Sequence, residues 1–288
     1  MKLKDIPVIP VGRGSQPEES DGQNLSYIDM PSDMMKFERP HVPDPDSVAH
    51  LAGAREAMTW LRQALREYGA KDEPRLANLS GLDAESRELV NQILGEGEVS
   101  LTYSGAIRAR TQESVLAGVW RTFYLDQDDK VTVDLLEVAE VPHLVSMPDN
   151  HQHPVNVDPD GVPAEVMNSM PILAELESHC ARYANDPTPH VINLTLLPLS
   201  EADVEFLDER LGRGPVDVLS RGYGKCQIIS TQVANVWWVR YYNSMGTLIL
   251  NTLEVVDVPQ VLCAAAEDLR DSGTRLEEII APYWSDVA

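Results

Sequence analysis

Two stretches of the chain align without a gap: LGEGEVSLTYSGAIRARTQESVLAGVWRTFYLDQDDKVTVDLLEVAEVPHLV (residues 94–145) and LGRGPVDVLSRGYGKCQIISTQVANVWWVRYYNSMGTLILNTLEVVDVPQVL (residues 211–262). The offset between them is a constant 117 residues, and 14 of the 52 aligned positions are identical. The identities cluster in blocks, among them Val119-Trp120 on Val236-Trp237. Clustered identities at one fixed offset are typical of an internal duplication.

The repeat extends upstream at an offset of 115 residues, which places Leu61 on Leu176 and Pro74 on Pro189. A two-residue insertion in the second copy joins the two offsets. We therefore define a first copy, residues 48–145, and a second copy, residues 165–262, each of about 100 residues, the size of a small domain. Residues 146–164 between them contain HQHPVNVDPDGVP, whose prolines and aspartates are typical of a linker.

The two ends of the chain lie outside the repeat. Residues 1–47 carry seven scattered prolines, which predict an extended N-terminal arm. Residues 263–288 include AAAEDLRDSGTRLEEIIAPYW, which predicts a C-terminal helix capped around Asp271 or Ser272 and ending near Pro282. We expect this helix to pack across one of the copies.

Each copy predicts the same order of elements. Apolar residues at helical spacing indicate a first helix, and a short apolar segment after it indicates a strand. Asp83 and Ser200 are candidate N-caps of a second helix, which Gly95 or Gly212 ends. Three strand-like runs follow, the later two joined by hairpin turns. The expected strands are 76–79, 99–103, 114–125 and 130–141 in the first copy and 191–197, 216–219, 228–242 and 247–258 in the second.

This order predicts an α+β fold: two tandem pseudo-equivalent units with mainly antiparallel sheets and helices covering one face. Within each unit Trp120 and Trp237 occupy the same position in the middle of a strand, so we expect both in the core. Trp238 must point to the opposite face of its strand. If helices cover only one face, one of the two neighbouring indoles is exposed, and an exposed Trp marks a binding surface.

Charge and composition narrow the classes of partner. The 288 residues contain 23 Lys and Arg against 46 Asp and Glu, a formal net charge of −23. Nucleic acid and anionic membranes are therefore disfavoured partners, whereas a cationic protein segment is favoured. The short apolar stretch near Lys2 is broken by prolines, and no run approaches the length of a transmembrane helix, so we expect a cytoplasmic protein.

Two glycine-rich segments are the candidate binding loops. LGEGEV (residues 94–99) lacks the third glycine of a dinucleotide fingerprint and carries two acids that would repel phosphate. It is either a helix cap leading into a strand or a partner-contacting loop. RGYGKC (residues 221–226) is basic and is present in full only in the second copy, so it is either a tight turn or a specialised contact. The candidate partner-binding residues are Gly95, Glu96, Gly97, Glu98, Arg221, Gly222, Tyr223, Gly224 and Trp238.

Signals for catalysis are weak. Three widely spaced cysteines form no C-x-x-C, and the linker pair His151-x-His153 has no fourth ligand in view. Cys226, near Lys225 and Arg221, has either a lowered thiol pKa or the character of a buried inert thiol. The sequence matches none of the serine, zinc or lactamase signatures. We therefore predict no enzyme activity and no cofactor.

Several motifs in order resemble the HupH/HyaF hydrogenase expression and formation proteins. They are GRGSQPEE (residues 12–19), LGEGEV, GVW (residues 118–120), INLTLLPLSEAD (residues 192–203) and RGYGKC, and the resemblance covers nearly the whole chain. Arg13 departs from the pattern, because the family has a proline between the two glycines.

The resemblance implies an accessory, chaperone-like protein in the maturation of a membrane-bound uptake nickel–iron hydrogenase. The expected partner is the iron–sulfur small-subunit precursor before export, including its twin-arginine leader, together with other maturation factors. No catalytic or metal-binding residue carries over from the family. The alternative is a redox or ligand-transfer enzyme of cofactor assembly that acts through Cys226 or the His151 and His153 pair.

Overall fold

The computed structural model describes residues 45–69, 73–147, 152–222 and 224–284. The predicted N-terminal arm lies almost entirely outside these residues, which begin at the short helix α1 (Pro45–Val48). None of the helices within the described ranges is long and apolar enough to cross a membrane.

The two copies contain the same elements in the same order. The first copy consists of α2 (Ala52–Glu67), β1 (Arg75–Asn78), α3 (Ala84–Leu94), β2 (Val99–Ser104), β3 (Arg108–Glu113), β4 (Val119–Leu125) and β5 (Val131–Val138). The second consists of α4 (Ser169–Tyr183), β6 (His190–Asn193), α5 (Glu201–Leu211), β7 (Val216–Ser220), β8 (Lys225–Ser230), β9 (Val236–Tyr242) and β10 (Leu248–Val255). Short 3₁₀ turns η1 (His143–Ser146), η2 (Leu194–Leu196) and η3 (Gln260–Leu262) and the final helix α6 (Ala266–Ile280) complete the described chain.

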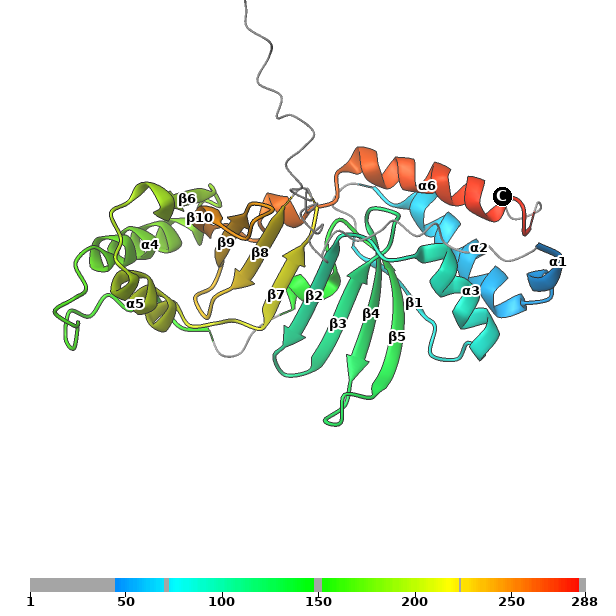
Figure 1. Ribbon diagram of the computed structural model, residues 1–288, viewed down its shortest axis with the longest axis horizontal. Coiled ribbons are helices and arrows are strands. Elements are labelled where there is room, and N and C mark those ends of the chain that lie inside the picture. Colours follow the sequence, from blue (N-terminus) through cyan, green and yellow to red (C-terminus); the bar gives the residue numbers. More distant parts are fainter. Residues whose placement is uncertain (1–44, 70–72, 148–151, 223, 285–288) are drawn as a thin grey trace, which may run out of the picture. The chain divides into compact units, whose positions relative to one another are not determined.

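The ten strands of the described residues form one antiparallel sheet in the order β1-β5-β4-β3-β2-β7-β8-β9-β10-β6 (Figure 1). The copies meet at the pair β2 and β7, where Leu101 lies opposite Val218, the residue 117 places later. Ser100 lies opposite Leu219, and Thr102 lies opposite Asp217, so the pairing is symmetric about the central pair. The copies are therefore related by a pseudo-twofold axis between Leu101 and Val218, as in an isologous dimer interface.

The predicted α+β class and internal duplication are confirmed, but the prediction of three strand-like runs after the second helix is wrong. Each copy has four described strands there. A turn divides the expected strand 228–242 into β8 and β9, and in the first copy β3 lies before the expected strand 114–125. The hydroxyl of Ser114 accepts the Leu116 N–H at 3.0 Å, and the hydroxyl of Thr231 accepts the Val233 N–H at 3.1 Å. These turns end β3 and β8. The sequence of β3, RARTQE, is too polar for a strand to be recognised from hydrophobic alternation.

The predicted helix ends are correct for α3 and α5. The Asp83 side chain accepts the Ser86 N–H at 2.8 Å, and Ser200 forms a capping box with Asp203. Gly95 and Gly212 end these helices with φ of 56° and 62°, values that favour glycine. The predicted capping of the last helix at Asp271 or Ser272 is wrong, because α6 already begins at Ala266.

Three apolar clusters of described residues form the core. One lies between α2, α3, α6 and the first copy's strands, and a second lies between α4, α5 and the second copy's strands. The third lies on the opposite sheet face, where Leu144 of η1 and Leu262 of η3 cover strands of both copies. No described helix packs extensively on β2, β3, β7 or β8, and Figure 1 shows these strands between the two groups of helices.

The C-terminal helix belongs to the first copy's core, although it follows the second copy in sequence. Leu276 and Ile280 are fully buried in the core cluster that includes α2. Glu277 forms an ion pair with Arg66 of α2, with 2.6 Å between a carboxylate oxygen and a guanidinium nitrogen. Figure 1 shows α6 beside α2. The last helix therefore packs on the first copy, although it follows the second copy in sequence.

Candidate functional site: the junction between the two copies

The structure brings the two predicted binding loops together. Because β2 pairs with β7, the segment before β2 lies beside the segment after β7. The Arg221 N–H donates to the Glu98 carbonyl at 3.0 Å. A Cβ added at Gly222 would lie 2.6 Å from a carboxylate oxygen of Glu98, so glycine permits this close approach. Residues 95–98 of the first copy and the described part of residues 221–225 of the second therefore form one surface, which we call the junction.

The first-copy loop is held tightly against the end of β3. The Gly97 N–H donates to the Glu113 carbonyl at 2.7 Å, and a Cβ at Gly97 would lie 2.3 Å from the Ser114 carbonyl oxygen. The Gln112 side-chain amide donates to the Gly97 carbonyl at 3.0 Å. Glu96 and Glu98 remain exposed on this fixed turn, where a partner can reach them.

The second-copy loop is also shaped by a glycine. Gly224 has φ of 124°, and a Cβ there would lie 2.7 Å from the Tyr242 carbonyl oxygen. Arg221 and Lys225 are exposed, and the Lys225 ammonium lies 5.5 Å from the centre of the Tyr242 ring. Tyr223 lies outside the described residues.

The pseudo-twofold axis creates a second, equivalent contact, which lacks these features. There the Ser104 N–H donates to the Pro215 carbonyl at 2.8 Å, the counterpart of the bond from Arg221 to Glu98. The corresponding loops read SGAIR (residues 104–108) and LGRGPV (residues 211–216), without the paired acids and without the second glycine of the basic loop. The same fold thus forms both contacts, and only one carries the acids and the glycine-rich basic loop.

An open depression of about 250 Å³ adjoins the junction on the helix-bearing face of the sheet. Glu96 of the junction lies at its rim, and Arg110 supplies a positive charge. The other side chains on this face are polar or aromatic, so the depression can accept both hydrogen bonds and a flat apolar group. They include Ser100, Thr102, Gln112 and Phe123.

Glu113, at the end of β3 beside the junction, has an unusual pKa. Burial, with smaller contributions from the nearby charges of Glu98 and Asp268, raises the pKa of its carboxyl to about 7. Sequence analysis missed this residue. Its repeat partner is Ser230, and this contrast between the copies was the available signal.

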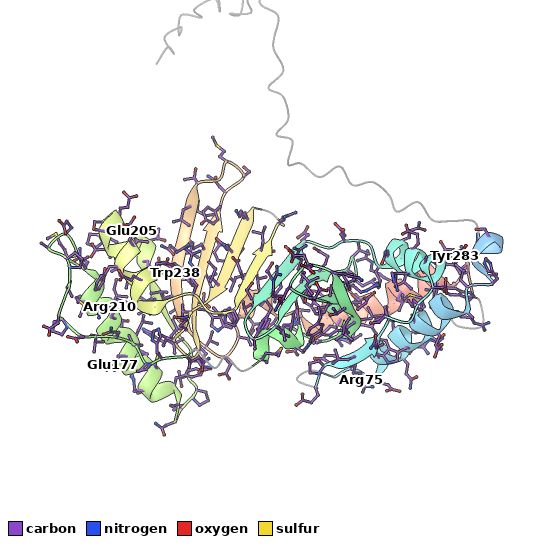
Figure 2. The ribbon with its side chains drawn as sticks, turned by 90° about the horizontal axis from the view of Figure 1, so that it is seen from below. Arg75, Glu177, Glu205, Arg210, Trp238 and Tyr283 are labelled. Atoms are coloured by element: carbon purple, nitrogen blue, oxygen red, sulfur yellow. The ribbon has the colours of Figure 1, made fainter. Side chains whose placement is uncertain are left out.

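The expectation that Trp238 or its neighbour is exposed is wrong. Trp237 and Trp238 are 5% and 2% exposed, because helices cover one face of β9 and the η1 and η3 turns contribute to the cover of the other. The Trp238 indole donates to the Asn251 side chain at 2.5 Å, under α5 (Figure 2). Trp238 therefore has almost no surface to offer a partner.

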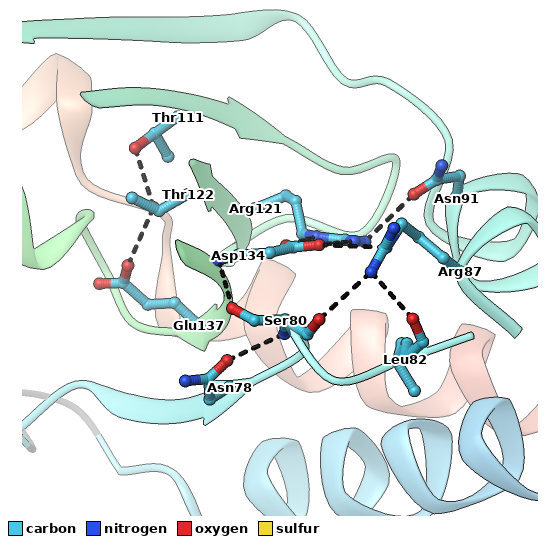
Figure 3. Close-up of polar contacts among 10 residues, drawn as sticks. All are labelled: Asn78, Ser80, Leu82, Arg87, Asn91, Thr111, Arg121, Thr122, Asp134 and Glu137. Atoms are coloured by element: carbon cyan, nitrogen blue, oxygen red, sulfur yellow. Dashed lines mark hydrogen bonds and ion pairs between the residues drawn. The ribbon is translucent and has the colours of Figure 1, made fainter. Parts of the chain in front are cut away.

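The residue equivalent to Trp238 in the first copy is also buried, but it is charged. Arg121 occupies the same repeat position, and its guanidinium pairs with the buried Asp134 carboxylate at 2.6 Å (Figure 3). Asp134 corresponds to Asn251, so a buried ion pair in one copy replaces a neutral Trp–Asn pair in the other. The Asp134 N–H also donates to the Ser80 hydroxyl at 3.0 Å. These contacts join strands to the loop after β1 and serve the fold.

Of the residues of the enzymatic alternative, Cys226 and His153 lie within the described ranges. Burial raises the pKa of the Cys226 thiol to about 11, so the lowered pKa considered from the sequence is wrong. The His153 N–H donates to the Gln232 carbonyl at 2.8 Å, which holds this part of the linker on the second copy. His151 lies outside the described residues.

The fold and the junction together define a tandemly duplicated α+β protein. Its two copies share one sheet, and the two contacts between them carry different residues. The chain belongs to the HupH hydrogenase expression protein family. The family's C-terminal conserved region matches residues 51–152 and again residues 166–283, one match for each copy.

The similarity to named relatives covers almost the whole chain. It is 42% identical over 276 residues to the hydrogenase expression/formation protein HoxQ of Cupriavidus necator, covering 96% of both chains. It is 30% identical over 279 residues to the hydrogenase-1 operon protein HyaF of Escherichia coli, covering 93% of this chain and 94% of HyaF. A solved structure of hydrogenase expression protein HupH from Thiobacillus denitrificans is 28% identical, with a TM-score of 0.38, over 40% of this chain and 95% of that one.

Proposed function

We propose that this protein is a cytoplasmic accessory factor in hydrogenase maturation that binds the iron–sulfur small-subunit precursor before export, without catalysing a reaction. Membership of the HupH family supports the role in maturation. The observation that carries partner binding is the asymmetry of the two inter-copy contacts. One fold builds both, yet the exposed acids and the glycine-rich basic loop are placed together at one of them.

The junction fits an extended cationic segment. Glu96 and Glu98 are exposed on a fixed turn, and carboxylates bind guanidinium groups in bidentate geometry. The adjoining depression offers Ser100 and Thr102 as hydrogen-bonding groups and Phe123 as an apolar surface. A twin-arginine leader has the charge to bind the acids, and the residues after it would then cross the depression.

A binding measurement tests this proposal. The full chain is titrated with the small-subunit precursor, and the double variant Glu96→Gln with Glu98→Gln is compared with the unsubstituted protein. The matched control is Glu177→Gln with Glu205→Gln, which removes the same two charges from exposed positions on α4 and α5 (Figure 2).

We expect the junction variant to bind at least about tenfold more weakly than the unsubstituted chain. Hydrogen bonds to charged groups contribute about 1.5 kcal/mol or more, which corresponds to about tenfold in affinity. The control should bind within about twofold of the unsubstituted chain, because dispersed charge affects affinity little. Equal weakening in both variants would show that overall charge acts and that the junction does not.

A further inference from the structure

Three metal-ligating side chains converge on the second copy, away from the junction. Glu175 and His179 lie one turn apart on α4, and His190 begins the neighbouring strand β6. Their ligand atoms all lie within 4.8 Å of one another. His190 Nε2 lies 2.7 Å from a carboxylate oxygen of Glu175, and the two imidazole rings are parallel with centres 3.3 Å apart. Helix spacing and strand position thus place all three groups at one point.

Arg182, one turn further along α4, contacts this cluster. One of its guanidinium nitrogens lies 2.7 Å from His179 Nε2. An imidazole binds a metal ion through a free nitrogen lone pair, so this contact must open before His179 can act as a ligand.

The first copy shows that the fold does not require this cluster. At the 115-residue offset, Glu175, His179 and His190 correspond to Trp60, Ala64 and Arg75. The same helix–strand pair forms there, and Arg75 instead makes an ion pair with Glu67 at 2.7 Å. The convergence is therefore specific to the second copy.

We propose that Glu175, His179 and His190 bind a divalent transition-metal ion. Two imidazoles and one carboxylate are a donor set that Zn²⁺ accepts, with a fourth position left for water or a partner's side chain. The Glu175 side chain is 46% exposed and that of His190 is 27% exposed, so an ion can reach both side chains from solvent. Arg182 must turn away to solvent, and its charge opposes the ion.

Zinc titration of the full chain tests this assignment. The chelator-treated protein is titrated with Zn²⁺ by calorimetry, and Co²⁺ reports the ligand field by its visible spectrum. We expect one saturable site, weakened about tenfold or more in His179→Ala and in His190→Arg, the residue of the first copy. Arg182→Ala should bind Zn²⁺ more tightly, because a nearby positive charge is removed.

Two controls separate this site from adventitious binding. His50 lies 3.6 Å from Glu85 and forms an exposed His–Glu pair, so His50→Ala should leave the affinity unchanged. His153→Ala tests the linker in the same way. Circular dichroism confirms that each variant folds. The absence of saturable Zn²⁺ binding, equal affinity in His179→Ala, or loss of binding only in His153→Ala would overturn the proposal.

Discussion

Trp120 and Trp237 occupy equivalent positions in the two copies and make the same hydrogen bond. The Trp120 indole donates to the Ala139 carbonyl at 3.0 Å, and the Trp237 indole donates to the Val256 carbonyl at 3.1 Å. Ala139 and Val256 are again 117 residues apart. Both indoles are buried, which confirms the prediction made from the repeat. Each indole hydrogen bond joins its strand to the segment that follows the last strand of the same copy.

Replacing either indole should therefore destabilise the protein. We expect Trp120→Ala and Trp237→Ala each to lower the free energy of unfolding by about 3–5 kcal/mol, because a large cavity forms in a packed core. Denaturant unfolding measures this change. Trp60→Ala, at a half-buried position on α2, is the control and should cost less. A loss below about 1 kcal/mol at Trp120 or Trp237 would contradict the assigned core role.

The buried Arg121–Asp134 pair yields a second prediction. Asp134→Asn alone leaves the Arg121 charge buried without its counter-ion, which should cost about 3–5 kcal/mol. Combining it with Arg121→Trp reproduces the Trp238–Asn251 pair of the second copy, and we expect this double variant to regain stability relative to Asp134→Asn. Chemical denaturation of the single and double variants measures the coupling. Additive losses would show that the two copies do not accept each other's pair.

Glu113 predicts a pH dependence at the junction. Its pKa is raised from 4.5 to about 7, so the folded chain keeps a proton that the unfolded chain releases. Its contribution to stability is complete below about pH 4.5 and is lost as the pH rises through about 7. Glu113→Gln should remove this slope and stabilise the protein relative to Glu113 above pH 7. Urea unfolding from pH 5 to 8 tests this, and a pH-independent difference between the two proteins would contradict it.

The sequence predicts the fold well where the copies agree. Asp83, Ser200, Gly95 and Gly212 mark helix ends because capping chemistry is local. The gapless 117-residue offset predicts equivalent strands, and the structure places Leu101 opposite Val218 across the centre. The union of both copies into one sheet is not predictable from the repeat, because the identity of matched residues does not specify which strand edges pair.

The sequence predicts the candidate site less completely. Both junction loops are recognisable from their glycines and charges, but their contact depends on the β2–β7 pairing. The predicted exposure of Trp238 or its neighbour is wrong because strand alternation assigns a residue to one face of the sheet and does not predict what covers that face. Glu175, His179 and His190 look scattered in sequence, since the two histidines are 11 positions apart and only the return of the chain from α4 to β6 joins them.

The net charge of −23 gives a prediction for the kinetics of partner binding. A cationic leader should be attracted over a distance, so the association rate should fall as salt rises and the Debye length shrinks from ~10 Å at 0.1 M to ~3 Å at 1 M. Stopped-flow mixing with the small-subunit precursor measures this rate, with and without its leader.

Glu96 and Glu98 should carry the local part of this attraction, whereas Arg221 and Lys225 repel a cation and leave their loop to contribute by packing. We therefore expect Glu96→Gln with Glu98→Gln to flatten the salt dependence more than Glu177→Gln with Glu205→Gln, because long-range steering is strongest for charges nearest the docking site. Removing the leader should flatten it further. An association rate that is indifferent to both salt and leader would exclude electrostatic capture and would leave the folded body of the subunit as the recognised part.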